Sequence, residues 1–139
     1  MIVRRALALL ALSVLGCGPS QPITDTRLWS DTYELRLSTD PLPPRARERT
    51  LYKIVVRDKK TKQPIEGGQG RIYATNQDQR SIWDSMQPGP EVGTYYSTLN
   101  FVTAGDWAIA AEFRRDSTKR LEKMEWRQDV RSARGEPGT

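Results

Sequence analysis

Apolar side chains alternate with polar ones along much of the chain, and this alternation restricts the possible folds more than any other feature. In the clearest example, Trp107, Ile109, Ala111 and Phe113 occupy every second position. Successive side chains of a β-strand point to opposite faces, so this spacing predicts a strand with one buried face. Helical periodicity is scarce between residues 29 and 130, and the sequence therefore predicts an all-β domain.

Short segments with this pattern are separated by turn-forming residues. The expected strands are 33–37, 51–57, 71–75, 81–84, 94–102, 107–113 and 121–130. Connections rich in Pro, Gly, Asp and Lys, such as 58–64 and 87–90, separate them. About seven such strands predict an immunoglobulin-like antiparallel β-sandwich, in which two sheets share one core. The expected core anchors are the aromatic residues Trp29, Trp107, Trp126, Tyr95 and Phe101.

The first 16 residues have the composition of an export signal. Arg4 and Arg5 precede an uncharged run over residues 6–16. As a helix this run of about 11 residues is roughly 16 Å long, whereas the hydrocarbon core of a bilayer is about 30 Å thick. The run is therefore short for a membrane span and fits a signal-peptide helix that is removed on export.

The apolar run ends in Val14, Leu15, Gly16 and Cys17, which together resemble the lipobox of bacterial lipoproteins. In that family the cysteine receives a covalent lipid such as palmitate and becomes the new N-terminus, so the resemblance implies a lipidated Cys17. Cys17 is also the only cysteine, which excludes a disulfide within the chain, and acylation would account for the unpaired thiol. The alternative is an ordinary secretory signal followed by an incidental cysteine.

Composition divides the chain into four parts. Residues 1–16 are the signal peptide, 17–28 the lipidated cysteine and a flexible tether, 29–130 the sandwich, and 131–139 a polar tail expected to be disordered. The net charge of +5 includes the two arginines of the signal peptide. Export and this modest charge argue against a nucleic-acid partner. The expected location is the bacterial cell envelope, with the domain lipid-anchored and either periplasm-facing or surface-exposed.

Two groups of residues resemble the YtkA-like and FixH-like family of small bacterial immunoglobulin-like domains. The first group is Gly93, Tyr95, Leu99 and Phe101, followed by Ala104, Gly105, Trp107 and Ile109, and the second is Val55 and Asp58, followed by Gln63, Pro64, Ile65 and Gly67. The resemblance covers residues 33–128. It implies a link with copper handling or with cytochrome oxidase assembly. Gly93 and Gly105 are expected at turn positions that need a positive φ.

The ligands for a copper site are scarce in this sequence. The chain contains no His, and after removal of the signal peptide only Met86 and Met124 remain as thioether donors. Copper(I) needs several soft ligands and copper(II) favours imidazole. Met124 is expected in the core, which leaves Met86, in a predicted loop, as the single weak candidate ligand. We therefore expect no cofactor other than the covalent lipid at Cys17.

The residue inventory also argues against an enzyme. Without His the chain can form neither a Ser-His-Asp triad nor a Cys-His pair. The carboxylates that could act instead lie mostly in turn-like segments and are expected to be solvated turn formers. They are Glu66, Asp84, Glu91, Asp106 and Asp116.

Basic residues gather in two of the predicted connections. They are Lys59, Lys60 and Lys62 in the first, and Arg114, Arg115, Lys119 and Arg120 in the second. If the strands alternate in direction, the loops 58–64, 84–93 and 114–120 share one end of the sandwich, and the tether is expected to enter at that end. Each basic residue near an anionic membrane contributes about 1 kcal/mol, so these loops are candidates for facing acidic headgroups. The alternative is scattered solubilising charge.

The sequence thus predicts a non-catalytic, membrane-anchored lipoprotein whose domain docks an envelope or periplasmic protein partner. The family resemblance implies that this docking serves oxidase or metal-protein assembly. One alternative is a periplasmic copper-binding carrier, which the absence of His disfavours. The other alternative is a purely structural envelope lipoprotein.

Overall fold

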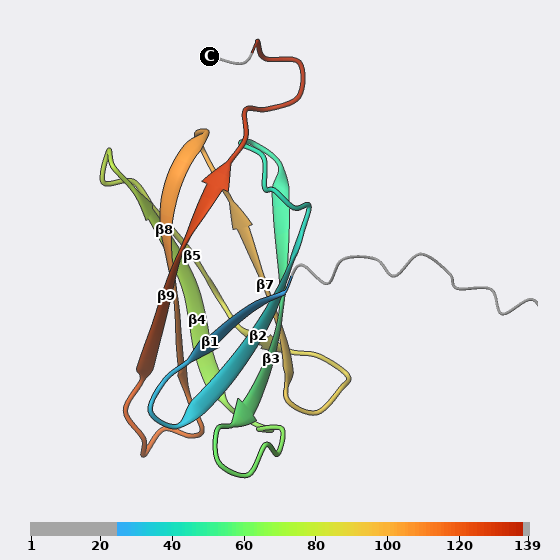
Figure 1. Cartoon of the computed structure of the whole chain (residues 1–139), viewed down its shortest axis with the longest axis vertical. Helices are drawn as coiled ribbons and strands as arrows, with labels where there is room; N and C mark the ends of the chain where they lie inside the picture. The colour runs from blue at the N-terminus through green and yellow to red at the C-terminus, as the bar shows by residue number, and fades with distance from the viewer. Residues whose placement is uncertain (1–24, 138–139) are drawn as a thin grey trace, which may run out of the picture.

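Two antiparallel β-sheets packed face to face make up the domain (Figure 1). The structure, a computed structural model, describes residues 25–137, and every regular element in this range is a strand. The predictions that fall on residues 1–24, namely the signal-peptide helix, the lipidated Cys17 and most of the tether, lie outside the described residues. The predicted all-β sandwich is confirmed.

The two sheets are built from nine strands. The five-stranded sheet has the order β1-β2-β3-β7-β6, with β1 at Thr26–Trp29, β2 at Tyr33–Asp40, β3 at Arg49–Asp58, β7 at Thr94–Asn100 and β6 at Gln87–Pro88. The four-stranded sheet has the order β5-β4-β8-β9, with β5 at Ser81–Ser85, β4 at Gln69–Asn76, β8 at Gly105–Arg114 and β9 at Glu122–Val130. With β2 as the first strand, this order is that of an immunoglobulin-like fold, with A, B, E and D in one sheet and C, F and G in the other.

All seven predicted strands are present, and β1 and β6 are the two that the sequence pattern missed. Both are short, with four residues in β1 and two in β6. A period of two cannot be recognised over so few positions, and Pro88 in β6 argues locally against a strand. Their pairing partners on β2 and β7 establish them as strands.

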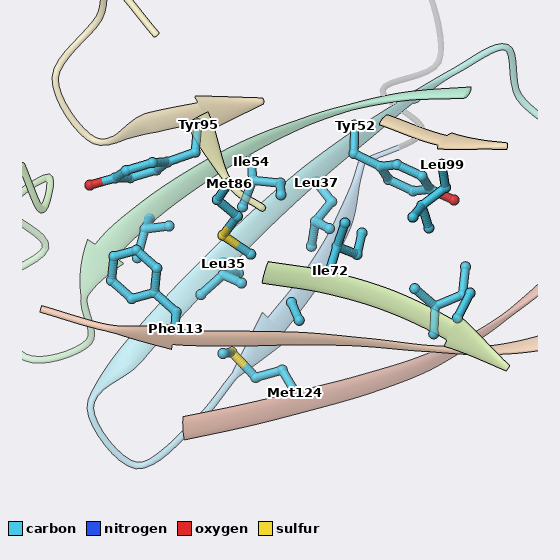
Figure 2. Packing of buried hydrophobic residues seen from close by; sticks show 14 of the residues in the cluster. Leu35, Leu37, Tyr52, Ile54, Ile72, Met86, Tyr95, Leu99, Phe113 and Met124 are labelled. Atoms are coloured by element: carbon cyan, nitrogen blue, oxygen red, sulfur yellow. The ribbon is translucent and has the colours of Figure 1, made fainter. Parts of the chain in front are cut away.

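The inward-facing side chains of the strands form one core between the two sheets (Figure 2). Trp107, Phe101 and Tyr95 are buried there, as predicted, and Trp126 is half-buried against the same core. Trp29 is 53% exposed, so its predicted role as a core anchor is wrong. In β1 it is Leu28, not Trp29, that packs against the core.

Both ends of the folded domain extend beyond the predicted boundaries of 29 and 130. Strand β1 begins inside the segment predicted as tether, with Thr26 opposite Leu37 in the register with β2. At the other end, Arg131 donates its backbone N–H to Pro44 and accepts a hydrogen bond from the N–H of Ala46. Backbone hydrogen bonds hold these polar segments, and hydropathy patterns do not reveal such bonds.

Two glycines occupy the turn positions that the sequence indicated. Gly93, before β7, has a φ of 78°, and Gly105, at the start of β8, has a φ of 118°. A side chain at position 93 would also meet Pro64, because a Cβ there would lie 2.6 Å from the proline Cβ. The predicted positive φ values are confirmed.

Candidate docking surfaces

Met86, the weak candidate for a metal ligand, belongs to the core. It lies between β5 and β6, where the chain crosses from the four-stranded to the five-stranded sheet, and it is only 6% exposed. Its N–H donates to the carbonyl of Gly70 at 2.9 Å, and its side chain packs among the apolar residues shown in Figure 2. Burial in this apolar environment keeps the Met86 thioether away from solvent, whereas the ligands of a carrier site must be accessible from solvent.

The described residues also hold no cluster that resembles a metal site. Across residues 25–137, no three His, Cys, Asp or Glu side chains gather as they would around a cation. Of the five carboxylates expected as solvated turn residues, Glu66, Glu91 and Asp106 are exposed, whereas Asp84 and Asp116 are half-buried. Asp84 lies within β5 and makes structural hydrogen bonds.

Asp84 links the two sheets along one side of the sandwich. Its Oδ2 accepts a hydrogen bond of 2.7 Å from the N–H of Thr98 in β7, and its Oδ1 accepts one from the N–H of Ser85. The hydroxyl of Ser97 donates to the carbonyl of Ser85 at 3.0 Å. With the crossing at Met86, these bonds join β5 to the opposite sheet, and we call this the closed side.

On the opposite side of the sandwich, β1 and β9 are the edge strands of the two sheets. Here long side chains connect the sheets, since Tyr52 donates its hydroxyl proton to Gln128 at 2.7 Å and the N–H of Thr32 donates to Glu122 at 3.1 Å. The rings of Tyr52 and Trp126 pack edge to face with centroids 6.3 Å apart. We call this the open side, because within residues 25–137 no backbone ladder joins β1 to β9.

The loops that carry the basic residues lie at one end of the sandwich (Figure 1). This end collects the β1–β2, β3–β4 and β8–β9 connections and the loop that precedes β7. Three of its seven cations have acidic neighbours: Lys62 pairs with Glu34 at 2.6 Å, Arg115 with Asp58 at 3.0 Å and Arg120 with Asp31 at 3.0 Å. Its net charge is therefore below what its basic residues alone would suggest, and a membrane-facing role stays a prediction.

Two carboxylates at this end are held in the charged form. A hydrogen bond from Lys62 lowers the pKa of Glu34 below its ordinary value. The backbone N–H groups of Thr61 and Lys60 lower the pKa of Asp58, with Arg115 adding to the effect. These hydrogen bonds shape the β3–β4 connection as a compact turn.

The chain enters the domain away from this end. Because Thr26 lies opposite Leu37, in the middle of β2, the first described residues lie part-way along the sandwich (Figure 1). The expected entry at the basic end is wrong, since that expectation took β2 as the first strand. Because β1 runs antiparallel to β2, the entry point lies about the length of β1 away from the basic end.

The outer face of the four-stranded sheet carries an exposed aromatic surface. Trp83 on β5 is 68% exposed and lies opposite Tyr73 on β4, which in turn lies opposite Ala110 on β8. The guanidinium of Arg71 lies over the ring of Tyr73, 5.4 Å from its centroid. We call Trp83, Tyr73, Ala108 and Ala110 the aromatic shelf.

A shallow trough of about 470 Å³ runs along β8, in the part of the shelf formed by Tyr73, Ala108 and Ala110. Ala108 and Ala110 form its floor, and Tyr73 and Thr75 form one wall. The opposite wall is charged and comes from β9, through Lys123, Glu125 and Arg127. Small residues in the central strand thus leave a hollow between an aromatic wall and a charged wall.

Trp83 could not be singled out from the sequence, because Ile82 and Trp83 are adjacent and both apolar. Alternation alone cannot decide which of two neighbouring apolar residues faces the core. The structure packs Ile82 against the core and leaves Trp83 outside.

A second hollow, of about 620 Å³, opens at the basic end of the open side. Its lining includes the exposed side chains of Trp29 and Leu121 beside Lys59 and Arg120. Lys59 donates its ammonium proton to the carbonyl of Ser30 at 2.9 Å. This surface is more polar than the shelf, and its aromatic residue, Trp29, lies at the end of the four-residue edge strand β1, next to the β1–β2 connection.

No protein-family model, curated protein or solved structure matched this chain. The resemblance to YtkA-like and FixH-like domains stays a prediction. Within residues 25–137 no helix is long and apolar enough to cross a membrane.

Proposed function

We propose that this chain is a non-catalytic lipoprotein of the bacterial envelope whose β-sandwich docks a protein partner through the aromatic shelf. The exposure of Trp83 on a rigid sheet carries this proposal. Tryptophan, tyrosine and arginine are enriched at the energetic centres of protein interfaces, and Trp83, Tyr73 and Arg71 are adjacent on this face. An isolated exposed tryptophan is common, whereas Trp83 lies beside a second aromatic residue, Tyr73, which lines a hollow that suits a partner side chain.

The anchoring part of the proposal rests on the N-terminal sequence. Cys17 carries the lipid, and Asp25, the first described residue, lies eight positions further along the chain. A chain segment of that length spans at most about 28 Å when fully extended. The domain therefore works close to the membrane surface, where its partner is an integral or membrane-bound envelope protein. Following the family resemblance, the finer proposal is a protein of oxidase or metal-protein assembly.

Site-specific photo-crosslinking in the native envelope tests the docking surface. A benzophenone amino acid is placed at position 83, and the matched control carries it at position 29, the other exposed tryptophan. We expect one defined adduct from position 83 that is reduced when Tyr73→Ala is added. The same adducts from both positions, or none from position 83, would contradict docking through the shelf.

The anchor has its own test, independent of the docking surface. With Cys17→Ser the protein is expected to move from the membrane fraction to the soluble fraction of the envelope, because the lipid attachment is lost. Membrane association that persists in this variant would argue against lipid anchoring at Cys17.

Mass spectrometry of the photo-adduct then identifies the partner, and oxidase subunits or copper proteins would support the assembly role.

A further inference from the structure

Strand β9 presents the longest open edge in the described structure. Its nine residues pair with β8 on one side, and across residues 25–137 no strand pairs with the other side. The other edges are shorter or blocked. Strand β1 has four residues, β6 has two and includes Pro88, and in β5 the N–H of Ser85 is taken by Asp84. An open edge of this length can accept a further strand.

The side chains on the outer face of β9 alternate in charge. They are Lys123, Glu125, Arg127 and Asp129, and all four are exposed. In this order of positive, negative, positive and negative, reversing the direction of the strand exchanges the signs. A second strand of the same sequence running antiparallel therefore places an opposite charge beside each of these residues.

We propose that β9 pairs with β9 of a second copy of this chain, antiparallel and about a two-fold axis at Trp126. In this register Lys123 lies opposite Asp129 of the second copy, and Glu125 lies opposite Arg127. The symmetry of a two-fold interface repeats each of these pairs. The four-stranded sheets of the two copies then form one continuous sheet, and the backbone groups along the edge of β9 gain partners.

Charge complementarity selects this one register. A shift by two residues in one direction places Glu125 opposite Glu125 and Lys123 opposite Arg127. The shift in the other direction places Arg127 opposite Arg127 and Glu125 opposite Asp129. Like charges directly opposite each other are unfavourable, and a shift by a single residue would turn the apolar side chains of β9 outward.

The ion pairs that these side chains make within one copy leave them available. Lys123 lies 2.8 Å from Glu125 and Arg127 lies 2.5 Å from Asp106, and all four side chains are about half exposed or more. Exposed pairs of this kind contribute little and rearrange readily. A partner strand can therefore recruit the same groups.

The two-fold axis also determines how the sheets, the basic ends and the chain entry points of the two copies are oriented relative to each other. A two-fold axis perpendicular to the joined sheet keeps both five-stranded sheets on the same side and points the two basic ends in opposite directions. Strand β1 lies beside β9 across the open side, so both chains enter the dimer from the same side. If the chain is anchored as proposed above, both lipids can then reach one membrane.

Charge reversal with rescue tests the pairing. The protein is the full chain with Cys17→Ser in mild detergent, and its mass is measured by sedimentation over a range of concentrations. We expect a dimer whose dissociation constant rises about tenfold or more with Arg127→Glu, since this change places two pairs of glutamates opposite each other. Adding Glu125→Arg restores opposite charges and is expected to restore the dimer. Arg120→Glu, the same change of charge outside β9, is the control and should have no effect.

A cysteine at the symmetry axis provides a second measurement that does not depend on charge. In the Cys17→Ser background, Trp126→Cys introduces the only cysteine. Directly opposed residues of antiparallel strands have Cα atoms about 4.5–5.5 Å apart, within the range of a disulfide. We expect mild oxidation to link Trp126→Cys chains and to leave Gln128→Cys chains unlinked. A monomer at all concentrations, a dimer unaffected by Arg127→Glu, or equal linking at both positions would overturn the proposal.

Discussion

The two sides of the sandwich are closed in different ways. On the closed side the chain itself crosses between the sheets at Met86, and Asp84 accepts a backbone hydrogen bond from the opposite sheet. On the open side two edge strands face each other, and the sheets are connected by side-chain bonds such as that of Tyr52 to Gln128 and, just past the end of β9, by the backbone bonds of Arg131 with Pro44 and Ala46. An edge that is sealed internally contributes to stability, whereas an edge left with free backbone groups is available to a partner. The closed edge therefore contributes to stability, whereas the open edge is the one available for strand pairing.

The largest expected difference between the two sides is in packing. Met86→Ala removes a buried side chain at the crossing of the closed side and should lower the free energy of unfolding by about 2–5 kcal/mol. Leu28→Ala, at a partly buried position on the open side, should cost only roughly 1–2 kcal/mol, because less of its surface leaves water on folding. Urea denaturation measures both. Met86→Leu is the control and should cost less than about 1.5 kcal/mol. Equal losses of unfolding free energy in Met86→Ala and Leu28→Ala would show that the two sides do not differ in packing.

The next difference is in the polar links between the sheets. Asp84→Ala leaves the N–H groups of Thr98 and Ser85 without their acceptor and should cost about 1–3 kcal/mol. Gln128→Ala removes one acceptor from the hydroxyl of Tyr52 on the open side and should cost about 0.5–1.5 kcal/mol. Thermal unfolding at neutral pH compares the two variants. Asp84→Asn keeps one acceptor oxygen, so it should lie between the parent and the alanine variant. A larger loss from Gln128→Ala would reverse the assignment of the two sides.

The smallest expected effect is the response of the basic end to acid. The pKa of Asp58 is lowered in the folded protein, so its charged form contributes stability that is complete above the ordinary carboxyl pKa of about 4. This contribution is lost as the pH falls through the lower folded value. In Asp58→Asn the loss of stability between pH 5 and pH 2, which is roughly the range these pKa values define, should be smaller than in the parent protein. Denaturation curves at several pH values measure it. An unchanged pH profile would show that the hydrogen bonds of the β3–β4 turn are not linked to folding.

Most of the strand pattern could be predicted from the sequence because it depends on neighbouring residues. The alternation over residues 107–113 predicts both β8 and the burial of Trp107, and the structure has both. Trp29 was expected in the core only as a large aromatic residue, and it is exposed, since the four residues of β1 are too few for alternation to indicate which side chains face inward. Trp83 shows the same limit, because its neighbour Ile82 is also apolar.

The candidate docking surfaces were less predictable. The basic loops could be assigned to one end from the alternating direction of the strands, but their pairing with Asp31, Glu34 and Asp58 depends on contacts between distant segments. Asp84 was expected in a solvated turn, and its role as a link became visible only once β5 lay beside β7. Likewise, the burial of Met86 follows from the crossing of the chain between the sheets.

By itself, the sequence determined the class of fold, the positions of seven strands, the two glycine turns and the alternating charges of residues 123–129, because each depends on residues close together in the chain. Only the tertiary structure decided which strands are edges, which tryptophans face solvent and which carboxylate joins the sheets. Sheet order is set by pairing between segments far apart in sequence, so the charge pattern of β9 is present in the sequence, whereas its position on an open edge is a property of the folded molecule.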